Sequence, residues 1–185
     1  MLGGIASASL SRALLATEGA VTATAANVFS SEQKATVDLL AEMIIPTTDT
    51  PGALSAGVPD FIASIVDSWY TTTERNIFFD GLSQLNQFTQ AQEDTPFHLA
   101  SEAARIAALK DQEQRAANYQ PPPITRMGLP KEDEQAPFFK KLRELVVLGY
   151  YTSEVGAKQE LIYLPMPGYY DGNVNFADVG RQWIS

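Results

Sequence analysis

The chain has 185 residues, 45% of them hydrophobic and 10% aromatic, which is the composition of one folded globular domain with a buried core and not of a disordered chain. Its 13 basic and 22 acidic residues give a net charge of −9, which argues against a nucleic-acid-binding protein because such proteins need clustered Lys and Arg. With no cysteine and a single histidine, His98, disulfides, thiolate zinc sites, cysteine-ligated iron–sulfur clusters and histidine-rich metal sites are all excluded.

The first residues have the composition of a leader. Leu2 to Ala26 is almost wholly small or apolar and ends in Ala23-Thr24-Ala25, an A-x-A cleavage pattern. A basic n-region is missing, because Arg12 is the only positive charge nearby. Two interpretations stay open for residues 1–26: a leader whose start lies further upstream, which we favour, or a plain Ala-rich helix. Residues 27–185 form the expected helical domain, and no segment is apolar over the roughly 20 residues that a membrane span needs.

Two helices are predicted in the first third of this domain. Ser30 and Gln33 have the spacing of a capping box, which marks a helix start. The apolar residues that follow recur at helical spacing and end before Pro46: Val37, Leu40, Ala41 and Ile44. Pro59 opens the second helix, where its missing N–H costs nothing. Its broad apolar face is expected in the core: Phe61, Ile62, Ile65, Val66 and Trp69.

Three more helices follow the same logic. Thr71 and Glu74 form a second capping box, and the third helix then directs four apolar residues inward: Phe78, Leu82, Leu85 and Phe88. A fourth helix begins near Ser101 and has two core candidates, Ile106 and Leu109. A fifth begins near Ala136 with one apolar stripe: Phe138, Leu142, Leu145, Val146 and Gly149.

Irregular segments separate and follow these helices. Residues 47–52 have strong turn chemistry, and residues 119–135 form a Pro-rich insertion that contains three consecutive prolines. The tail from Leu161 to Ser185 is rich in Pro and Gly and leaves room only for short extended pieces. The predicted fold is mainly α: a single compact domain of about five helices with a long irregular C-terminal arm.

Four residues are candidates for acid–base chemistry: Asp49, Asp60, His98 and Glu154. Their spacing gives no pair an obvious shared site, and turn chemistry or the helix dipole explains the two aspartates. The glycines match neither a dinucleotide-binding nor a Walker loop, and no G-x-S-x-G elbow is present. We therefore predict no catalytic, cofactor-binding or metal-binding residue in this chain.

The segment from Gly149 to Gly156 is the most informative part of the sequence. It places Tyr150, Tyr151 and Glu154 between two glycines, immediately after the fifth predicted helix. Adjacent tyrosines are typical of a buried position whose hydroxyl has a partner, and equally of an anchor in a protein interface. Composition alone does not choose between these two interpretations.

Three stretches resemble the gluconate 2-dehydrogenase subunit 3 family. The first is LAEMIIPTTDTPGA at residues 40–53, followed by AGVPDFI at 56–62. The second is FFKKLREL at 138–145, which continues into GYYTSEVG at 149–156, and the third is YYDG at 169–172. Together they extend over most of the chain from about Leu39 to Gly172.

The resemblance implies a non-catalytic small subunit of a periplasmic dehydrogenase. The implied partner is a large FAD-dependent subunit of the glucose–methanol–choline type that oxidises a sugar or sugar acid, and a cytochrome c subunit often receives the electrons. Family members typically carry a twin-arginine leader that exports the flavoprotein with them, whereas this chain has no twin arginine. The expected location is the periplasm, with any membrane association made through partners.

The leading hypothesis is an accessory subunit that binds, stabilises and helps to export a flavin dehydrogenase. We expect the interface on the irregular segments, through eight residues: Thr48, Asp49, Pro51, Tyr150, Tyr151, Glu154, Tyr169 and Tyr170. The competing hypotheses are an independent enzyme that uses Glu154 or Asp49 with His98, and a free-standing periplasmic binding or chaperone protein.

Overall fold

The computed structural model describes residues 28–122, 133–163, 168 and 172–184. The five main helices are α1 (Ser31–Ile44), α2 (Val58–Ser68), α3 (Thr72–Glu93), α4 (Glu102–Ala117) and α5 (Phe138–Thr152). The shorter elements are η1 (Phe97–Leu99), η2 (Gly156–Glu160), β1 (Ile162–Tyr163), α6 (Phe176–Val179) and β2 (Trp183–Ile184). The expected mainly α fold with five substantial helices is confirmed. The predicted leader and most of the insertion lie outside the described residues.

Three of the five main helices, α1, α3 and α4, begin where a side-chain oxygen satisfies one of their first free N–H groups. Both predicted capping boxes are present: the hydroxyls of Ser30 and Thr71 accept from the third residues of α1 and α3, whose side chains accept from the cap N–H groups in return. Ser101 caps α4 in the same way, by accepting from Ala104 N. Pro59 lies in the first turn of α2, as predicted. Local sequence therefore sets these helix starts.

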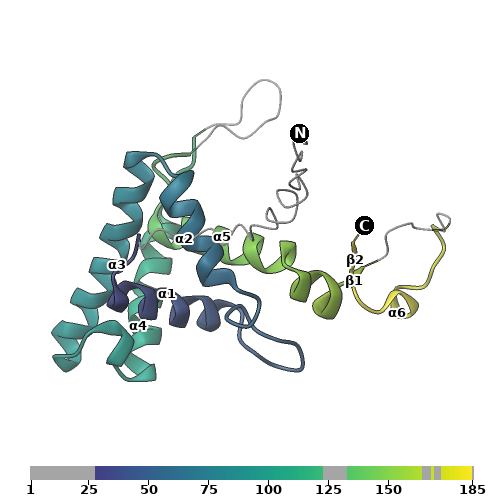
Figure 1. The fold of residues 1–185 in the computed structure, drawn as a ribbon, viewed down its shortest axis with the longest axis horizontal. Coiled ribbons are helices and arrows are strands. Elements are labelled where there is room, and N and C mark those ends of the chain that lie inside the picture. Colours follow the sequence, from purple (N-terminus) through teal and green to yellow (C-terminus); the bar gives the residue numbers. More distant parts are fainter. Residues whose placement is uncertain (1–27, 123–132, 164–167, 169–171, 185) are drawn as a thin grey trace, which may run out of the picture.

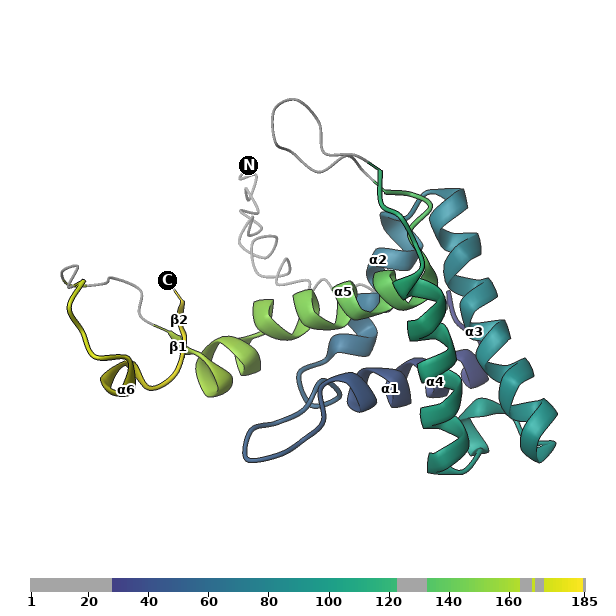
Figure 2. The same ribbon diagram turned by 180° about the vertical axis from the view of Figure 1, so that it is seen from behind.

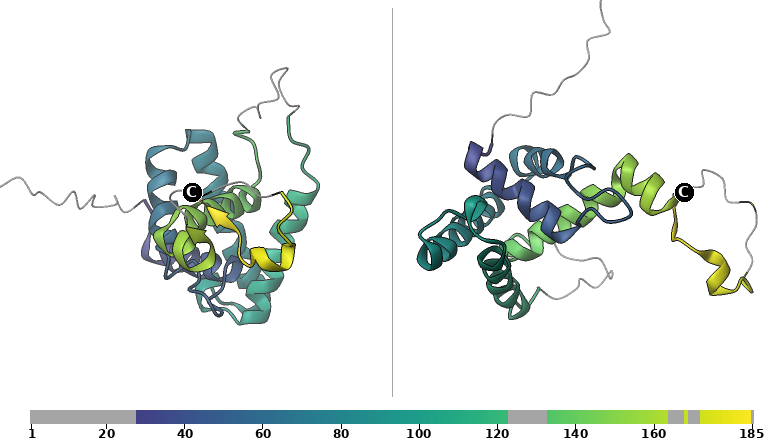
Figure 3. Two further views of the ribbon diagram at one scale, coloured as in Figure 1. Left: turned by 90° about the vertical axis from the view of Figure 1, so that its right-hand side faces the viewer. Right: turned by 90° about the horizontal axis from the view of Figure 1, so that it is seen from below.

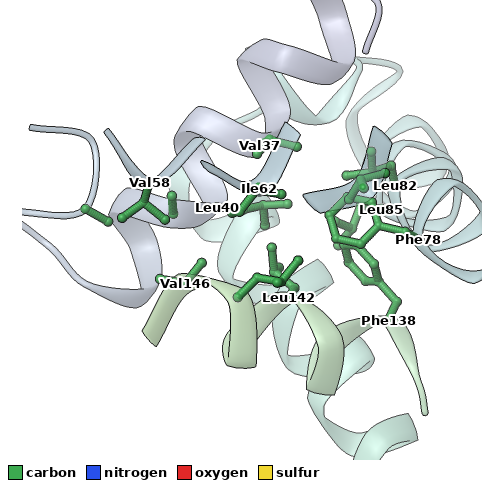
Figure 4. Close-up of a cluster of buried hydrophobic side chains, with 14 of the residues drawn as sticks. Val37, Leu40, Val58, Ile62, Phe78, Leu82, Leu85, Phe138, Leu142 and Val146 are labelled. Carbon is green, nitrogen blue, oxygen red and sulfur yellow. The ribbon is translucent and has the colours of Figure 1, made fainter. Parts of the chain in front are cut away.

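Helix α5 is the element around which the other helices pack. It contacts α2, α3 and α4, and more weakly α1, and Figure 1 shows it crossing the helical body. Figure 4 shows side chains of α5 directed at the neighbouring helices, with Phe138 beside Phe78 and Leu142 below Leu40 and Ile62. The rings of Phe78 and Phe138 lie 5.2 Å apart in an edge-to-face arrangement. The predicted stripe on this helix is confirmed as core.

Two glycines allow this close packing. A Cβ on Gly81 of α3 would lie 2.0 Å from Cγ of Phe138, and one on Gly149 of α5 would lie 2.7 Å from Cδ1 of Phe61. Real Cβ atoms do not approach other atoms so closely, so any larger residue would push α5 away from α3 or α2. The two glycines therefore determine how closely α5 approaches α3 and α2; neither of them is needed to form a turn.

A charged side chain is also part of the packed interior. Lys141 of α5 is 4% exposed, and its ammonium lies 2.8 Å from Oε1 of Glu74 at the start of α3. It also donates to the carbonyl of Asp133 and lies over the ring of Tyr70. Partial burial would raise the pKa of Glu74, but its hydrogen bonds with Lys141 and Thr71 outweigh burial and hold that pKa below its ordinary value. The buried ammonium is thus paired and hydrogen-bonded, as a buried charge requires.

Two predicted core residues lie on the surface instead. Trp69 is 78% exposed and Ile106 is 39% exposed, so their assignment to the core is wrong. Trp69 is the residue after α2, where the chain turns towards Tyr70, and the helical stripe that it was expected to continue ends with Val66. In α4 the buried positions are small or polar: Ala104, Ala108 and Gln112. Periodicity predicted both helices but not where each buried face ends.

The C-terminal half of α5 extends beyond the helical body towards the arm. Figures 1 and 2 show this half of the helix projecting from the other helices, with β1, β2 and α6 beyond its end. The right-hand view of Figure 3 agrees. The two strands are paired in parallel, with Ile162 opposite Trp183. Short extended pieces were expected in the tail, and the structure shows them together with the turns of η2 and α6.

Candidate partner-binding site

The segment between α1 and α2, residues 45–57, is called here the α1–α2 loop, and it contains the first family-like stretch. It lies at the same end of the molecule as the projecting half of α5 (Figure 1). Its last part returns to the helical body: Ala53 is fully buried, and its N–H donates to the carbonyl of Ile45 at 2.9 Å. Its first part is open, because the residues from Pro46 to Asp49 are exposed.

The carboxylate of Glu42 holds the two sides of this loop together. Its Oε1 accepts from the N–H of Thr47 at 2.8 Å, and its Oε2 accepts from the N–H of Leu54 at 3.2 Å. Partial burial would raise the pKa of Glu42, but hydrogen bonds from Thr47 and Leu54 outweigh burial and lower it. The carboxylate therefore remains ionised, and an ionised acceptor makes the stronger hydrogen bonds.

Two further hydrogen bonds attach the tip of the loop to the C-terminal part of the chain. The hydroxyl of Tyr150 in α5 donates to the carbonyl of Pro51 at 2.7 Å. The hydroxyl of Thr50 donates to Oε2 of Glu160 in η2 at 2.8 Å. The α1–α2 loop and the segment from Gly149 to Gly156, which are about 100 positions apart in sequence, are thus one structural unit.

The two adjacent tyrosines differ in burial: Tyr150 is in the core, and Tyr151 is partly exposed. Tyr150 is 1% exposed, so it belongs to the core, and its hydroxyl has the partner that a buried tyrosine needs. Tyr151 is 38% exposed, with its ring edge-to-face against Tyr150 at 5.3 Å. A direct contact with a partner therefore stays a prediction for Tyr151, whereas the side chain of Tyr150 is buried and holds the α1–α2 loop.

The other predicted interface residues are solvent-exposed or only partly buried. Thr48 and Asp49 are exposed and joined by a side-chain hydrogen bond of 3.1 Å, and Pro51 is partly buried. The carboxylate of Glu154 is exposed and pairs with Lys158 at 2.7 Å, and this hydrogen bond lowers its pKa. Tyr169 and Tyr170 lie outside the described residues. Their partner contacts remain predictions.

Exposed large apolar side chains collect at this end of the molecule. In the described part of the chain, eleven such residues are exposed, and seven of them lie between Val147 and Trp183. The seven, with Leu54 of the α1–α2 loop, are here called the apolar end: Leu54, Val147, Leu148, Tyr151, Ile162, Tyr163, Val174 and Trp183. Single exposed apolar residues are normal, whereas a contiguous patch of them would mark an interaction site.

Most of these residues were missed by the sequence reasoning. Val147 and Leu148 lie within a helix that was predicted with a single inward stripe, which left its second apolar face without comment. The signal was present: apolar residues at 147, 148 and 151 recur at helical spacing on the side opposite the stripe. An open hollow of ≈ 220 Å³ adjoins this face and is lined by Lys140, Arg143, Glu144 and Val147.

The three residues of the enzymatic alternative are not joined in the structure. Asp49 lies in the α1–α2 loop and Glu154 follows α5, while His98 lies in η1, which packs against α1 and α3. Asp49 bonds to Thr48 and Glu154 to Lys158. In His98, the buried Nδ1 has no hydrogen-bond partner among the residues that the structure describes.

The residues that the structure describes contain neither a metal-ligand group nor a membrane-spanning helix. Within that part of the chain, no group of three or more His, Asp or Glu side chains is arranged to hold a metal ion. None of its helices combines the length and hydropathy that crossing a membrane requires.

The comparisons with known proteins agree with the first and second family-like stretches. A family model described as gluconate 2-dehydrogenase subunit 3 matches residues 31–168. The match includes the α1–α2 loop, all of α5 and β1, and it ends before α6 and β2. Searches of curated proteins and of solved structures give no match.

Proposed function

The chain belongs to the gluconate 2-dehydrogenase subunit 3 family, and on this basis we propose that it is a non-catalytic small subunit that binds, stabilises and helps to export a large FAD-dependent dehydrogenase. The large subunit, of the glucose–methanol–choline type, holds the FAD and oxidises a sugar or sugar acid. The complex works in the periplasm, and a cytochrome c subunit accepts its electrons. The family name supports membership of a gluconate dehydrogenase complex, and the finer assignments are our proposal.

The apolar end is the observation that carries this proposal. Tyr163 is 49% exposed and Trp183 is 52% exposed, and Leu148 on α5 is 50% exposed. Large apolar and aromatic side chains that protrude together gain most when another protein covers them. A subunit of a heteromer needs such a surface, and this one lies beside the loop that resembles the family signature.

The charge of the chain favours a different protein as the occupant of this surface. Two copies would each bring a net charge of −9, and repulsion between them would oppose self-association at low salt. A large subunit that is less acidic has no such penalty. The surface is therefore better suited to a heteromeric contact than to a homodimer.

Co-expression tests the proposal directly. The large flavoprotein is produced with the full chain, without it, and with a variant whose apolar end carries Leu148→Asp and Tyr163→Asp. We expect the flavoprotein to co-purify with the wild-type chain and to lose solubility, export and dehydrogenase activity in the other two cultures. A matched control is Ile106→Asp, which places a charge at an exposed position on α4, far from the apolar end in sequence.

The opposite results separate the alternatives. A flavoprotein that is equally soluble, exported and active alone would refute the accessory role. Turnover by the isolated small chain that is abolished by His98→Ala would instead favour the independent enzyme. A stable monomer that is recovered from its native source with no fixed partner would favour the free-standing binding protein.

A further inference from the structure

We propose that the α1–α2 loop is a preformed docking element for the large subunit, and that Glu42 and Tyr150 are the positioning residues that hold its shape. The inference rests on the proposed function and goes one step beyond it. It assigns a role to two side chains that do not themselves lie on the apolar end, and it predicts a property of the free subunit, namely an ordered loop.

The α1–α2 loop is held in place from three directions. Glu42 holds it from α1, Tyr150 from α5, and Glu160 from η2, through hydrogen bonds of 2.7 to 3.2 Å. Within the loop, the N–H of Gly52 also donates to the hydroxyl of Thr47 at 3.1 Å. Two of these elements, α5 and η2, are not the helices that the loop connects, so the loop is attached beyond what its connecting role requires.

At Gly52 the backbone of the loop closely approaches Thr47 and Glu42. A Cβ at this position would lie 2.5 Å from the N atom of Thr47 and 2.7 Å from each carboxylate oxygen of Glu42. Only glycine lets the loop backbone reach the carboxylate that binds both of its sides. The shape of the loop and the position of Glu42 therefore depend on each other.

The α1–α2 loop, held in this way, exposes an apolar side chain on one side and polar side chains on the other. The buried side of the loop contains Gly52 and Ala53, while Leu54 is 51% exposed beside them. Leu54 is the residue whose N–H is bonded to Glu42, so the carboxylate fixes the backbone from which this apolar side chain projects. Thr48 and Asp49 are exposed on the other side of the same loop.

The benefit of such an arrangement is a smaller ordering cost on binding. A loop that is already in its bound conformation loses less conformational freedom when a partner docks, which improves affinity without any new contact. If only a fraction of the free molecules had the loop in place, the apparent affinity would fall by that fraction. Loosening the loop should therefore weaken binding even though neither positioning residue touches the partner.

The experiment compares four full-length variants with matched chemistry. Tyr150→Phe removes the hydroxyl that bonds to Pro51, and Tyr119→Phe removes a hydroxyl that bonds to Asp133 at the base of the other long loop. Glu42→Gln weakens a carboxylate that accepts two loop N–H groups. Glu93→Gln weakens a carboxylate that accepts the N–H and hydroxyl of Ser101.

Three quantities are measured for each variant: hydrogen exchange at the amides of Thr47, Gly52 and Leu54, the global free energy of unfolding, and the Kd and association rate for the FAD-loaded large subunit. We expect faster exchange at these amides in Tyr150→Phe and Glu42→Gln. We also expect a Kd about 3- to 10-fold weaker, as for the loss of one or two hydrogen bonds. The loss should lie mainly in the association rate, and the two control variants should bind as the wild type does.

Each contrary outcome has a distinct meaning. Loosened loop amides with unchanged Kd would overturn the docking element and leave the accessory role standing. Unchanged exchange at the loop amides would overturn the assignment of the two positioning residues. Equal loss of affinity in the control variants would show a general effect of lower stability and would also overturn the inference. A wild-type chain that does not bind the large subunit would instead refute the proposed function.

Discussion

The two halves of α5 share one buried stripe but differ in what their outer face exposes. In the first half, Phe138 fits against Gly81 of α3, and the ammonium of Lys141 is buried against Glu74. In the second half, Val147 and Leu148 are exposed, and the helix continues past the body of the molecule (Figure 2). The first half exposes the charged residues Arg143 and Glu144 on this outer face, while the inner stripe stays buried from Phe138 to Tyr150.

This difference separates the residues that fold the chain from those that are left for a partner. Side chains in the first half contribute to stability through burial. The exposed side chains of the second half, Val147, Leu148 and Tyr151, contribute little to the isolated subunit, and under the proposed function they would be buried on docking. Substitutions in the buried stripe of α5 should therefore change stability, whereas substitutions at the exposed positions Val147, Leu148 and Tyr151 should change affinity. Single substitutions on the two faces of α5 can test that division.

Phe138→Ala should have the largest effect. The change leaves a cavity between α5 and α3, and we expect a loss of about 3–5 kcal/mol in the free energy of unfolding, measured with denaturant. Leu148→Ala, ten positions later in the same helix, is the matched control and should change stability by less than about 0.5 kcal/mol. Similar losses for both variants would show that the second half of α5 is packed in the isolated chain.

Lys141→Met should cause the next largest loss in the free energy of unfolding. Removing one partner of a buried ion pair leaves the other charge without compensation, and we expect a loss of about 3 kcal/mol. Glu74→Gln and the double variant complete a cycle that isolates the pair interaction. In contrast, Lys158→Met breaks the exposed pair with Glu154 and should have no measurable effect on the melting temperature. A large effect from the exposed pair would contradict the proposed division.

Tyr151→Ala should weaken binding of the large subunit by about 2 kcal/mol if its exposed ring is an interface anchor. Titration of the purified flavoprotein measures this, and a thermal melt of the isolated subunit should change little. A lower melting temperature with unchanged affinity would instead place Tyr151 among the residues that stabilise the fold. Ile106→Ala, on the exposed face of α4, is the control and should change neither quantity.

Acidification should loosen the α1–α2 loop before the helical body unfolds. The pKa of Glu42 is lower in the folded chain than its ordinary value of 4.5. Its ionised form therefore stabilises the folded loop above about pH 4.5, and this contribution is lost as the pH falls through the lower folded pKa. Hydrogen exchange at Thr47 and Leu54, corrected for the intrinsic effect of pH, should lose protection in that range. In Glu42→Gln, the protection of these amides should no longer depend on pH in that range.

Trp69→Ala should have the smallest effect. A core tryptophan would cost about 3–5 kcal/mol on truncation, but a side chain that is 78% exposed should cost less than about 0.5 kcal/mol. Its fluorescence maximum should already lie at the long wavelength of a solvated indole; Trp183→Phe leaves Trp69 as the only tryptophan for this measurement. A large loss of stability would show that the exposed position is not the one that is populated in solution.

Much of the helical architecture could be predicted from local sequence. The capping boxes at Ser30 and Thr71 and the proline in α2 mark helix starts through short-range hydrogen bonds and backbone restriction, which need no tertiary contact. The stripe of α5 is readable because 3.6-residue periodicity places it on one face. The error at Trp69 arose because periodicity does not say where a neighbouring helix stops covering that face.

The candidate site was harder to predict, since its parts are distant in sequence. The turn residues at 47–52 and the two tyrosines could be recognised separately, but nothing local connects Pro51 with Tyr150. The same is true of Glu42, which reads in the sequence as an ordinary polar position on α1. Only the folded chain shows that this carboxylate binds both sides of the loop.

Caps, periodicity and contiguous motifs are each encoded within a few residues. The sequence alone therefore specifies the class of fold, the starts of the main helices and the resemblance to the gluconate 2-dehydrogenase subunit 3 family. Three properties are visible only in the folded chain: which of the adjacent tyrosines is buried, how the α1–α2 loop is held, and that the second half of α5 has an uncovered apolar face. These properties depend on which elements meet in space. Contacts between segments about 100 positions apart in sequence determine this arrangement, and no local sequence pattern predicts them.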